Sequence, residues 1–307
     1  MNGSTDRYLN AARRDSTRRR YLQALEHFEE QWGGVLPASS ESVVRYLAAH
    51  AEQLSVATLR THLAALAQWH QRQGFVDPTK APQVRDVLRG IKAEHPQAVK
   101  RAEALQLQAL EACIDVLQHQ VESAQPAIRL RAGRDRALVL LGFWRAFRGD
   151  DLCRLRIEHI QVRSGEGMEI FLASGKTDRQ HEGVTFAVPA LKRMCPVQAY
   201  EDWLDISGLR HGPVFRSIDR WGHLGHESLN PNSVSRLLRH AFVRNGLDGD
   251  SYSGHSLRRG FATWASKNQW GTKALMDYVG WRDVQSAMRY IDATAPFGDW
   301  RRGESGE

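Results

Sequence analysis

Apolar side chains recur every three or four positions in four stretches of the first hundred residues, which is the spacing of one helix face. Each stretch starts at a residue that begins helices well, because Ser accepts a hydrogen bond from a free backbone N–H and Pro needs no donor there. The four starts are Ser16, Ser39, Ser55 and Pro82. The first stretch continues to Trp32 without a break. We therefore expect a compact all-α domain in residues 1–95.

The spacing of apolar residues changes after this domain. Residues 96–102 break the helical pattern and are expected to form a linker. Two long helical patterns follow, near 103–120 and 127–146. Three short runs of β-forming residues then alternate with turn residues, and they predict a small antiparallel sheet. These runs are residues 158–162, 168–173 and 183–188.

The remainder of the chain returns to a helical pattern at Pro196 and contains a polar loop near residues 211–229. The sequence thus predicts a fold that is mainly α with a small antiparallel β-sheet. Its first part is a helical domain of four to five helices, and its second part, residues 103–307, is a mixed α/β domain.

Charge and composition limit the classes of function. The 307 residues include 42 Lys and Arg against 35 Asp and Glu, so the net charge is +7, which is compatible with a polyanionic partner. Three cysteines lie far apart and favour a reduced compartment over a disulfide framework. We expect a cytoplasmic protein without a membrane helix or a signal peptide, because no long apolar run is present. His223 and His226 have no further ligand nearby, so we expect no metal site.

Five short features of the second domain carry residues suited to chemistry. They are Phe147–Leu152, Lys176 in the predicted hairpin, Gly254–Gly260, Val279–Trp281 and Met288–Ile291. Each is common by chance when taken alone. In order they give an Arg, an acidic residue three positions later, a hairpin Lys, His-x-x-Arg, Trp and Tyr. This order resembles the tyrosine recombinase (phage integrase) family, in particular its simple two-domain members, and the resemblance covers the whole chain. It implies a core-binding domain followed by a catalytic domain.

The resemblance implies an enzyme that cleaves and rejoins duplex DNA through a 3′-phosphotyrosyl intermediate, with Tyr290 as the nucleophile. Arg148 and Arg258 would hold the scissile phosphate, because a guanidinium never loses its charge and its planar fork grips two oxygens. Preorganised donors of this kind stabilise the extra charge of the pentavalent transition state. The bond energy stays in the phosphotyrosyl link, so we expect no ATP, metal or other cofactor.

Four further residues complete the expected site. Lys176 would protonate the departing 5′-oxygen, and His255 would bond the phosphate and help to move the tyrosine proton. Trp281 would donate its indole N–H to a phosphate oxygen. Asp151 would act behind these groups by orienting His255.

Basic and polar side chains on the predicted helices are candidates for DNA contact, through phosphates or through base edges. They are Arg18, Arg19, Arg60, His62, Lys80, Arg85 and Arg89 in the first domain, and Arg259 beside the second clamping arginine. These residues are selected by residue type and by their place on the predicted helices.

The resemblance also implies partners. The expected partner is duplex DNA with an inverted-repeat recombination site, bound by a homo-tetramer on two such sites that exchanges strands through a Holliday junction. The protein would then be associated with the nucleoid. Two other functions stay open: a type IB topoisomerase-like relaxase that uses the same residues, and a DNA-binding regulator of the same fold without catalysis. The intact set of catalytic residue types speaks against the regulator.

Overall fold

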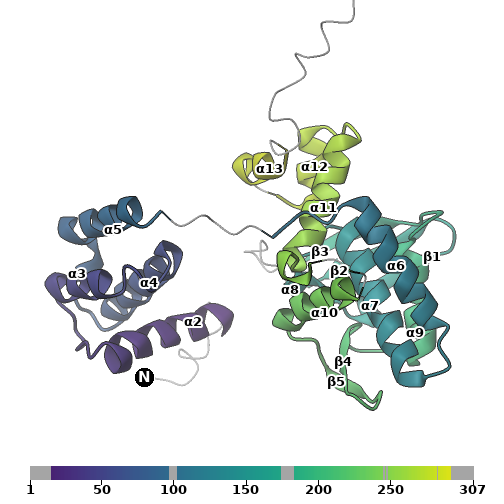
Figure 1. Cartoon of the computed structure of the whole chain (residues 1–307), viewed down its shortest axis with the longest axis horizontal. Coiled ribbons are helices and arrows are strands. Elements are labelled where there is room, and N and C mark those ends of the chain that lie inside the picture. Colours follow the sequence, from purple (N-terminus) through teal and green to yellow (C-terminus); the bar gives the residue numbers. More distant parts are fainter. Residues whose placement is uncertain are drawn as a thin grey trace, which may run out of the picture. The chain divides into compact units, whose positions relative to one another are not determined.

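The computed structural model describes residues 15–96, 102–173 and 183–291, except positions 245, 247 and 282. The fold is mostly helical with small antiparallel sheets, as the sequence predicts (Figure 1). The chain divides into two compact units, residues 1–100 and 101–307. Most of the segment that we expect to be a linker lies outside the described residues. Within the described ranges, no helix combines the length and the apolar character needed to cross a membrane.

The first unit is built from helices alone in its described part. Its elements are α2 (Asp15–Glu26), the π-helical η1 (His27–Gln31), α3 (Ser40–Ala49), α4 (Val56–Arg72), the 3-10 turn η2 (Pro78–Lys80) and α5 (Pro82–Glu94). Ser39 caps α3 by accepting a hydrogen bond of 3.1 Å from the Ser42 N–H. Ser55 caps α4 in the same way, so both helices begin where the sequence predicts them. The first helical pattern is not one regular helix, because it changes to a π-helix at His27.

The core of this unit encloses a hydrogen-bonded tyrosine. Tyr46 is fully buried, and its hydroxyl lies 2.8 Å from His27 Nδ1 and 2.5 Å from His62 Nδ1. The π-helix is where the chain presents His27 to this hydroxyl, and π-helical turns often occur where a side chain has a special task. The pKa of His62 is lowered to about 4, mainly by burial and to a smaller extent by the neighbouring His27 and His50.

The second unit combines helices with two small sheets. Its helices are α6 (Leu107–Val121), α7 (Pro126–Trp144), α8 (Gly149–Cys153), α9 (Pro196–Ser207), α10 (Pro231–Val243), α11 (Gly254–Lys267), α12 (Thr272–Val279) and α13 (Val284–Ile291), with 3-10 turns η3 (Ile157–His159) and η4 (Gly249–Ser251). Its strands are β1 (Ile160–Arg163), β2 (Gly167–Leu172), β3 (Val184–Pro189), β4 (Arg216–Ile218) and β5 (Leu224–Ser228). The first three strands pair in the antiparallel order β1-β2-β3, as predicted.

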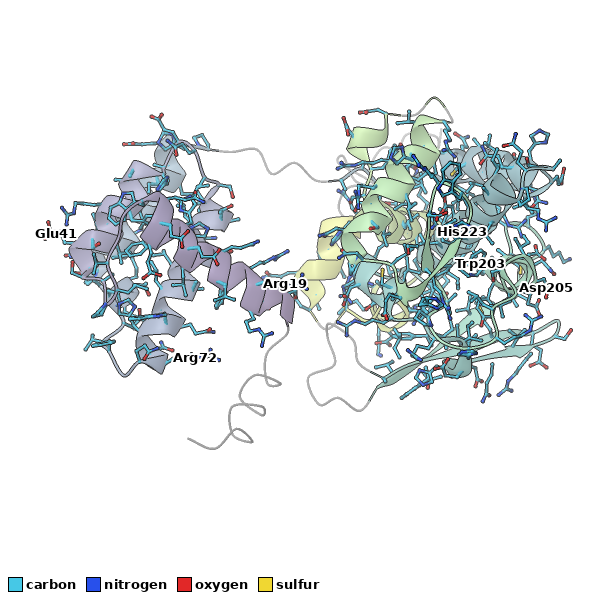
Figure 2. All side chains as sticks on the ribbon, turned by 90° about the horizontal axis from the view of Figure 1, so that it is seen from below. Arg19, Glu41, Arg72, Trp203, Asp205 and His223 are labelled. Carbon is cyan, nitrogen blue, oxygen red and sulfur yellow. The ribbon has the colours of Figure 1, made fainter. Side chains whose placement is uncertain are left out.

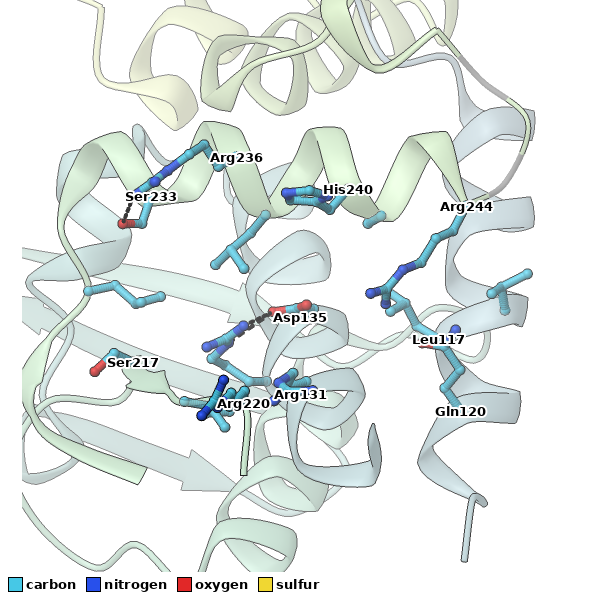
Figure 3. Close-up of a pocket in the computed structure, with 16 residues that line it drawn as sticks. Leu117, Gln120, Arg131, Asp135, Ser217, Arg220, Ser233, Arg236, His240 and Arg244 are labelled. Carbon is cyan, nitrogen blue, oxygen red and sulfur yellow. Dashed lines mark hydrogen bonds and ion pairs between the residues drawn. The ribbon is translucent and has the colours of Figure 1, made fainter. Parts of the chain in front are cut away.

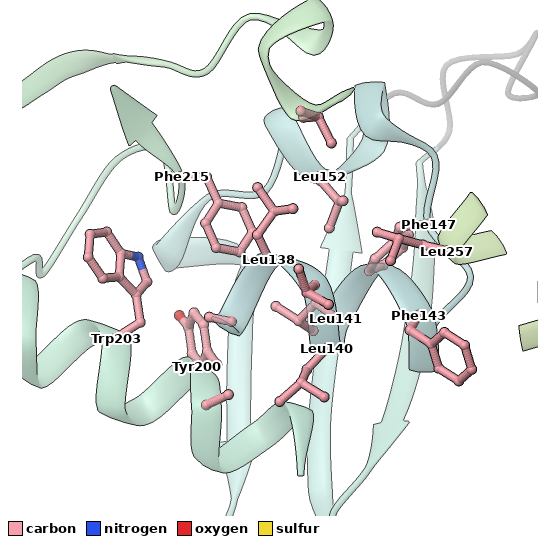
Figure 4. Close-up of a cluster of buried hydrophobic side chains, with 14 of the residues drawn as sticks. Leu138, Leu140, Leu141, Phe143, Phe147, Leu152, Tyr200, Trp203, Phe215 and Leu257 are labelled. Carbon is pink, nitrogen blue, oxygen red and sulfur yellow. The ribbon is translucent and has the colours of Figure 1, made fainter. Parts of the chain in front are cut away.

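Helix α7 is the central element of this unit. Its residues from Ala132 to Phe143 are buried on almost every side, and the buried charged side chains Arg134 and Arg136 are ion-paired within the same unit. It packs against α6, α9 and α11, and the buried side chains of the surrounding core come from residues 105–257 (Figure 4). On α9, Trp203 points into this core and donates to the Val214 carbonyl at 2.8 Å, whereas Asp205 faces solvent (Figure 2).

Two glycines allow α7 and α11 to lie close together. A Cβ atom at Gly142 of α7 would lie 2.5 Å from Cδ1 of Leu257 on α11. A Cβ atom at Gly260 of α11 would lie 2.7 Å from the ring of Phe143. Such distances are too short for real side chains. At Gly142 the neighbour is the end of a flexible side chain, whereas at Gly260 the nearest atom is the carbonyl oxygen of Leu105, at 2.3 Å, so the missing methyl group of Gly260 is also needed for α11 to lie against the segment before α6.

The region that we expect to be a polar loop contains a hairpin instead. Strands β4 and β5 pair antiparallel, and two arginines of α7 bond to the main chain of β4 and of the turn that follows it. Arg134 is ion-paired with Asp135 at 2.8 Å, which is the dashed line at Asp135 in Figure 3. It also donates to the Arg216 carbonyl at 3.2 Å. Arg131 donates to the carbonyl of Asp219 in the hairpin turn. These tertiary bonds stabilise a hairpin whose own side chains are mostly polar, which is why the hydrophobic pattern did not reveal it.

Candidate active site

Arg148 occupies the N-terminal cap of the short helix α8, directly after the end of α7. Its backbone N–H donates to Oδ2 of Asp151 at 3.1 Å, and its Nη1 lies 3.9 Å from the same oxygen. Asp151 is only 6% exposed, so water screens its attraction for the Arg148 guanidinium only weakly. The carboxylate therefore fixes both the main chain and the side chain of Arg148. The orientation of His255 by Asp151 stays a prediction.

Arg258 reaches the same place from α11. It is 4% exposed, and its Nη1 donates to the Ala146 carbonyl at 2.7 Å. Its guanidinium carbon lies 5.3 Å from the centre of the Trp281 ring, within the range of a cation–π contact. The adjacent Arg259 is half-buried and donates to the carbonyl of Ala102. The cavity described next is lined by Arg258 and not by Arg259. The His-x-x-Arg pattern selects the same one of the two adjacent arginines.

A cavity in the second unit brings these groups together. Its lining residues are Arg145, Ala146, Phe147, Arg148, Asp151, Leu172, Val184, Phe186, Arg258, Val279 and Gly280. Three guanidiniums and one carboxylate thus meet among apolar side chains, and such a site favours an anion. Arg145 was missed by the sequence reasoning.

The other expected catalytic residues are not part of this cavity lining, and two of them have side chains outside what the structure describes. His255 is exposed on the first turn of α11, where its backbone N–H donates to the capping Ser253 hydroxyl at 3.2 Å. Trp281 is 8% exposed and directly follows the cavity-lining Gly280. Tyr290 belongs to α13, but its side chain is outside what the structure describes. Lys176 lies outside the described residues.

The candidate DNA contacts of the first unit differ in exposure. Arg18, Arg19, Arg60, Lys80, Arg85 and Arg89 are exposed (Figure 2 labels Arg19), whereas His62 is 9% exposed and bonded to Tyr46. A buried, hydrogen-bonded imidazole does not reach a base edge, so we leave His62 out of the proposed DNA-contacting set. Arg89 is ion-paired with Asp86 at 3.3 Å, but both side chains are largely exposed, and such a pair is weak.

We also looked among the described residues for a metal site and for reactive cysteines. No three His, Cys, Asp or Glu side chains within the described ranges gather in a way that suits a metal ion. Cys113 and Cys153 are buried thiols whose pKa values burial raises to about 12, so neither is a thiolate at neutral pH.

Comparisons with known proteins agree with this geometry. The model of the Phage integrase family matches residues 114–295. The chain is 29% identical over 302 residues to an integrase/recombinase xerD homolog of Selenomonas ruminantium, covering 95% of this chain and 86% of that protein. It is 26% identical over 270 residues to recombinase cre of Escherichia phage P1, covering 83% and 76%.

Solved structures share the fold. The XerH site-specific recombinase bound to palindromic difH substrate in a post-cleavage complex aligns with a TM-score of 0.63 at 17% identity, covering 92% of this chain and 77% of that one. A lambda integrase dimer bound to a COC′ core site aligns with a TM-score of 0.60 at 18% identity and 96% coverage of both chains.

Proposed function

Because this chain belongs to the phage integrase family of tyrosine recombinases, we propose that it is a site-specific recombinase that cleaves and rejoins duplex DNA through a 3′-phosphotyrosyl intermediate. The observation that carries the proposal is the meeting of Arg148 and Arg258 in one cavity. They come from segments separated by about a hundred residues, and each is fixed by a bond to a buried group.

The two arginines suit the charge change of phosphodiester cleavage. A phosphodiester carries one negative charge, and its pentavalent transition state places more charge on the equatorial oxygens. Guanidiniums that are already fixed by Asp151 and by the Ala146 carbonyl need no reorganisation when this charge develops. The apolar lining of the cavity strengthens their attraction for the phosphate.

Tyr290 is the proposed nucleophile. Its oxygen attacks phosphorus and the 5′-oxygen leaves, which forms the 3′-phosphotyrosyl bond and frees a 5′-hydroxyl. Lys176 donates the proton that the 5′-oxygen takes up, and His255 contributes to phosphate binding and to removal of the tyrosine proton. Trp281 donates its indole N–H to a phosphate oxygen. Religation reverses these steps with a 5′-hydroxyl from the partner strand, so neither a metal nor ATP takes part.

We further propose how the protein assembles on DNA. The first unit binds one face of each half-site of an inverted repeat through its exposed arginines and lysine, and the second unit binds the same half-site, with Arg259 among its contacts. Four copies join two sites and exchange strands in pairs through a Holliday junction. This assembly places the protein with the nucleoid in the cytoplasm.

The proposal is tested on the DNA that flanks the gene. Footprinting of purified protein on this DNA is expected to protect inverted repeats around a short spacer. Incubation with a nicked form of the protected site, from which the 5′-hydroxyl strand diffuses away, is expected to trap a covalent complex that resists SDS. Binding without any covalent complex would favour the regulator. Relaxation of plasmids that lack the repeats, without recombinants, would favour the topoisomerase-like relaxase.

A further inference from the structure

Arg145 is a buried cation of the cavity that the proposed chemistry does not use. It caps the C-terminal end of α7 and is 6% exposed. Burial lowers its pKa to about 10, so the guanidinium stays charged at neutral pH. Its Nε has no hydrogen-bond acceptor among the described residues. A charge buried in this way is costly, which implies that its remaining contacts matter.

These contacts join three elements. The Arg145 Nη1 donates to the carbonyl of Tyr278 at the end of α12. The guanidinium carbon lies 4.2 Å from the ring centre of Tyr278 and 4.5 Å from that of Phe186 on β3. Arg145 thus lies against two aromatic rings, an arrangement that suits a planar guanidinium far better than an ammonium group.

A second bond ties the same residue of α12 to α7. The Tyr278 hydroxyl donates to the Trp144 carbonyl at 2.7 Å. The main chain of Tyr278 and its side chain therefore both bond to the last residues of α7. This double attachment fixes where α12 ends relative to Arg148, which follows three residues after Arg145.

The residues after Tyr278 connect the end of α12 to Trp281 and to helix α13. Gly280 has a φ of +72° and ends α12, and the N–H groups of Gly280 and Trp281 bond to the Met276 carbonyl at 2.8 and 2.9 Å. The turn is therefore stiff. Trp281 then lies beside Arg258, and α13, which carries Tyr290, starts at Val284.

Resting on the proposed function, we propose that Arg145 is a positioning residue for DNA cleavage. It holds the turn from Tyr278 to Trp281 at the edge of the cavity and so sets where Trp281 and helix α13 meet the phosphate. It acts through Tyr278 and does not itself bind the phosphate. Displacing reacting groups by about 1 Å is enough to slow an enzyme by about 100-fold.

The test separates cleavage rate from folding. In Arg145→Met the apolar stem is kept and the charge and donors are lost. On the nicked half-site, covalent complex is expected to form about 100-fold more slowly than in wild type, with unchanged DNA affinity and an unchanged final yield. A misfolded fraction would instead lower the yield and leave the rate of the remainder unchanged, and that result would overturn the proposal.

The matched control is Arg136→Met. Arg136 is equally buried on α7, but it bonds Gln118 and Asp202 and does not line the cavity. Its cleavage rate is expected to stay near that of wild type. Equal slowing in both variants would mean that any buried arginine of α7 has this effect, and the positioning role would be rejected.

A double-mutant cycle tests the route through Trp281. If Arg145 acts through the turn, Arg145→Met combined with Trp281→Phe is expected to slow cleavage by less than the product of the single effects. A strictly multiplicative loss would show that Arg145 acts independently of the turn.

Should Arg145→Met not fold, Tyr278→Phe removes only the bond to Trp144 and is expected to reduce the rate in the same direction. An unchanged rate in Tyr278→Phe would then overturn the proposal.

Failure of this inference differs from failure of the proposed function. If the wild-type protein forms no covalent complex on the footprinted site, the proposed function fails. If wild type forms the complex and Arg145→Met forms it equally fast, only the role of Arg145 fails.

Discussion

Arg258 donates a hydrogen bond of 2.7 Å to the carbonyl of Ala146, a fully buried residue whose φ is +54°. A left-handed conformation is unfavourable for a residue with a Cβ atom, so the surrounding structure must hold it. The turn at Ala146 reverses the chain between α7 and α8, two residues before Arg148. The two proposed phosphate-binding arginines are thus connected through a very short piece of main chain.

The conformation of Ala146 predicts an order of stability among its variants. Ala146→Gly is expected to fold with a free energy of unfolding within about 1 kcal/mol of wild type, because relief of strain offsets the greater freedom of the unfolded chain. Ala146→Val is expected to lose about 2 kcal/mol or more, because a β-branched residue resists this φ and the site has no room. Urea unfolding monitored by circular dichroism measures both values. A valine variant as stable as wild type would contradict the assigned conformation.

Removal of either clamping guanidinium is expected to slow cleavage far more than it weakens DNA binding. Arg148→Ala and Arg258→Ala should each lose about 3–4 kcal/mol of transition-state stabilisation, or about 100–1000-fold in the rate of covalent complex formation, by analogy with the loss of an oxyanion donor. Arg154→Ala is the control, because Arg154 follows α8 and pairs with Asp150 at 3.2 Å on the surface. If Arg154→Ala lost as much activity, the clamp assignment would be in error.

Tyr290→Phe is expected to abolish the covalent link and to leave DNA affinity unchanged, because the variant lacks only the attacking oxygen. Gel-shift titration measures the affinity, and SDS electrophoresis of the nicked half-site measures covalent capture. An SDS-resistant complex that persists in this variant would assign the nucleophile to another residue.

The buried imidazole of His62 predicts a pH dependence of stability. Its pKa is about 4 in the folded protein and about 6.5 in an unfolded chain, so protons bind the unfolded chain more readily. The stability due to neutral His62 is therefore fully present above about pH 6.5 and falls as the pH drops toward about 4, by about 1.4 kcal/mol per unit for one group. Melting temperatures at pH 7.5 and 5.0 check this.

The matched variant for that experiment is His62→Gln, which cannot titrate. It is expected to be less stable than wild type at pH 7.5, because the bond to the Tyr46 hydroxyl changes, but its melting temperature should fall less between pH 7.5 and 5.0. An identical fall in both proteins would show that His62 does not contribute. His27, whose pKa burial also lowers, would then be the next group to test.

The sequence predicted those helices and strands that depend on residues close to them in the chain. Ser39 and Ser55 cap the helices that follow them, and the β-forming runs pair as three antiparallel strands. The hairpin β4–β5 was missed because arginines of α7, about 85 residues away in sequence, bind its carbonyl groups. Hydrophobic spacing contains no information about bonds of that kind.

In the candidate site too, some residues were predicted from the sequence and others were not. The order of residue types led to Arg148 and Arg258, but a pattern of residue types does not reveal burial. His62 follows Leu59 by three positions and precedes Leu66 by four, and both leucines are fully buried, so the helical spacing already indicated an inward-facing histidine. Arg145 carries no such signal, since its contacts are to Tyr278 and Phe186, which are distant in sequence.

The missing side chain at Gly142 has a consequence for how this enzyme tolerates change. Gly142 faces Leu257, the residue directly before Arg258. An added methyl group there would meet the end of the Leu257 side chain, so this side chain would have to shift beside Arg258. A substitution in the hydrophobic interior would therefore act first on the neighbour of a proposed phosphate-binding arginine, although Gly142 is not part of the cavity lining.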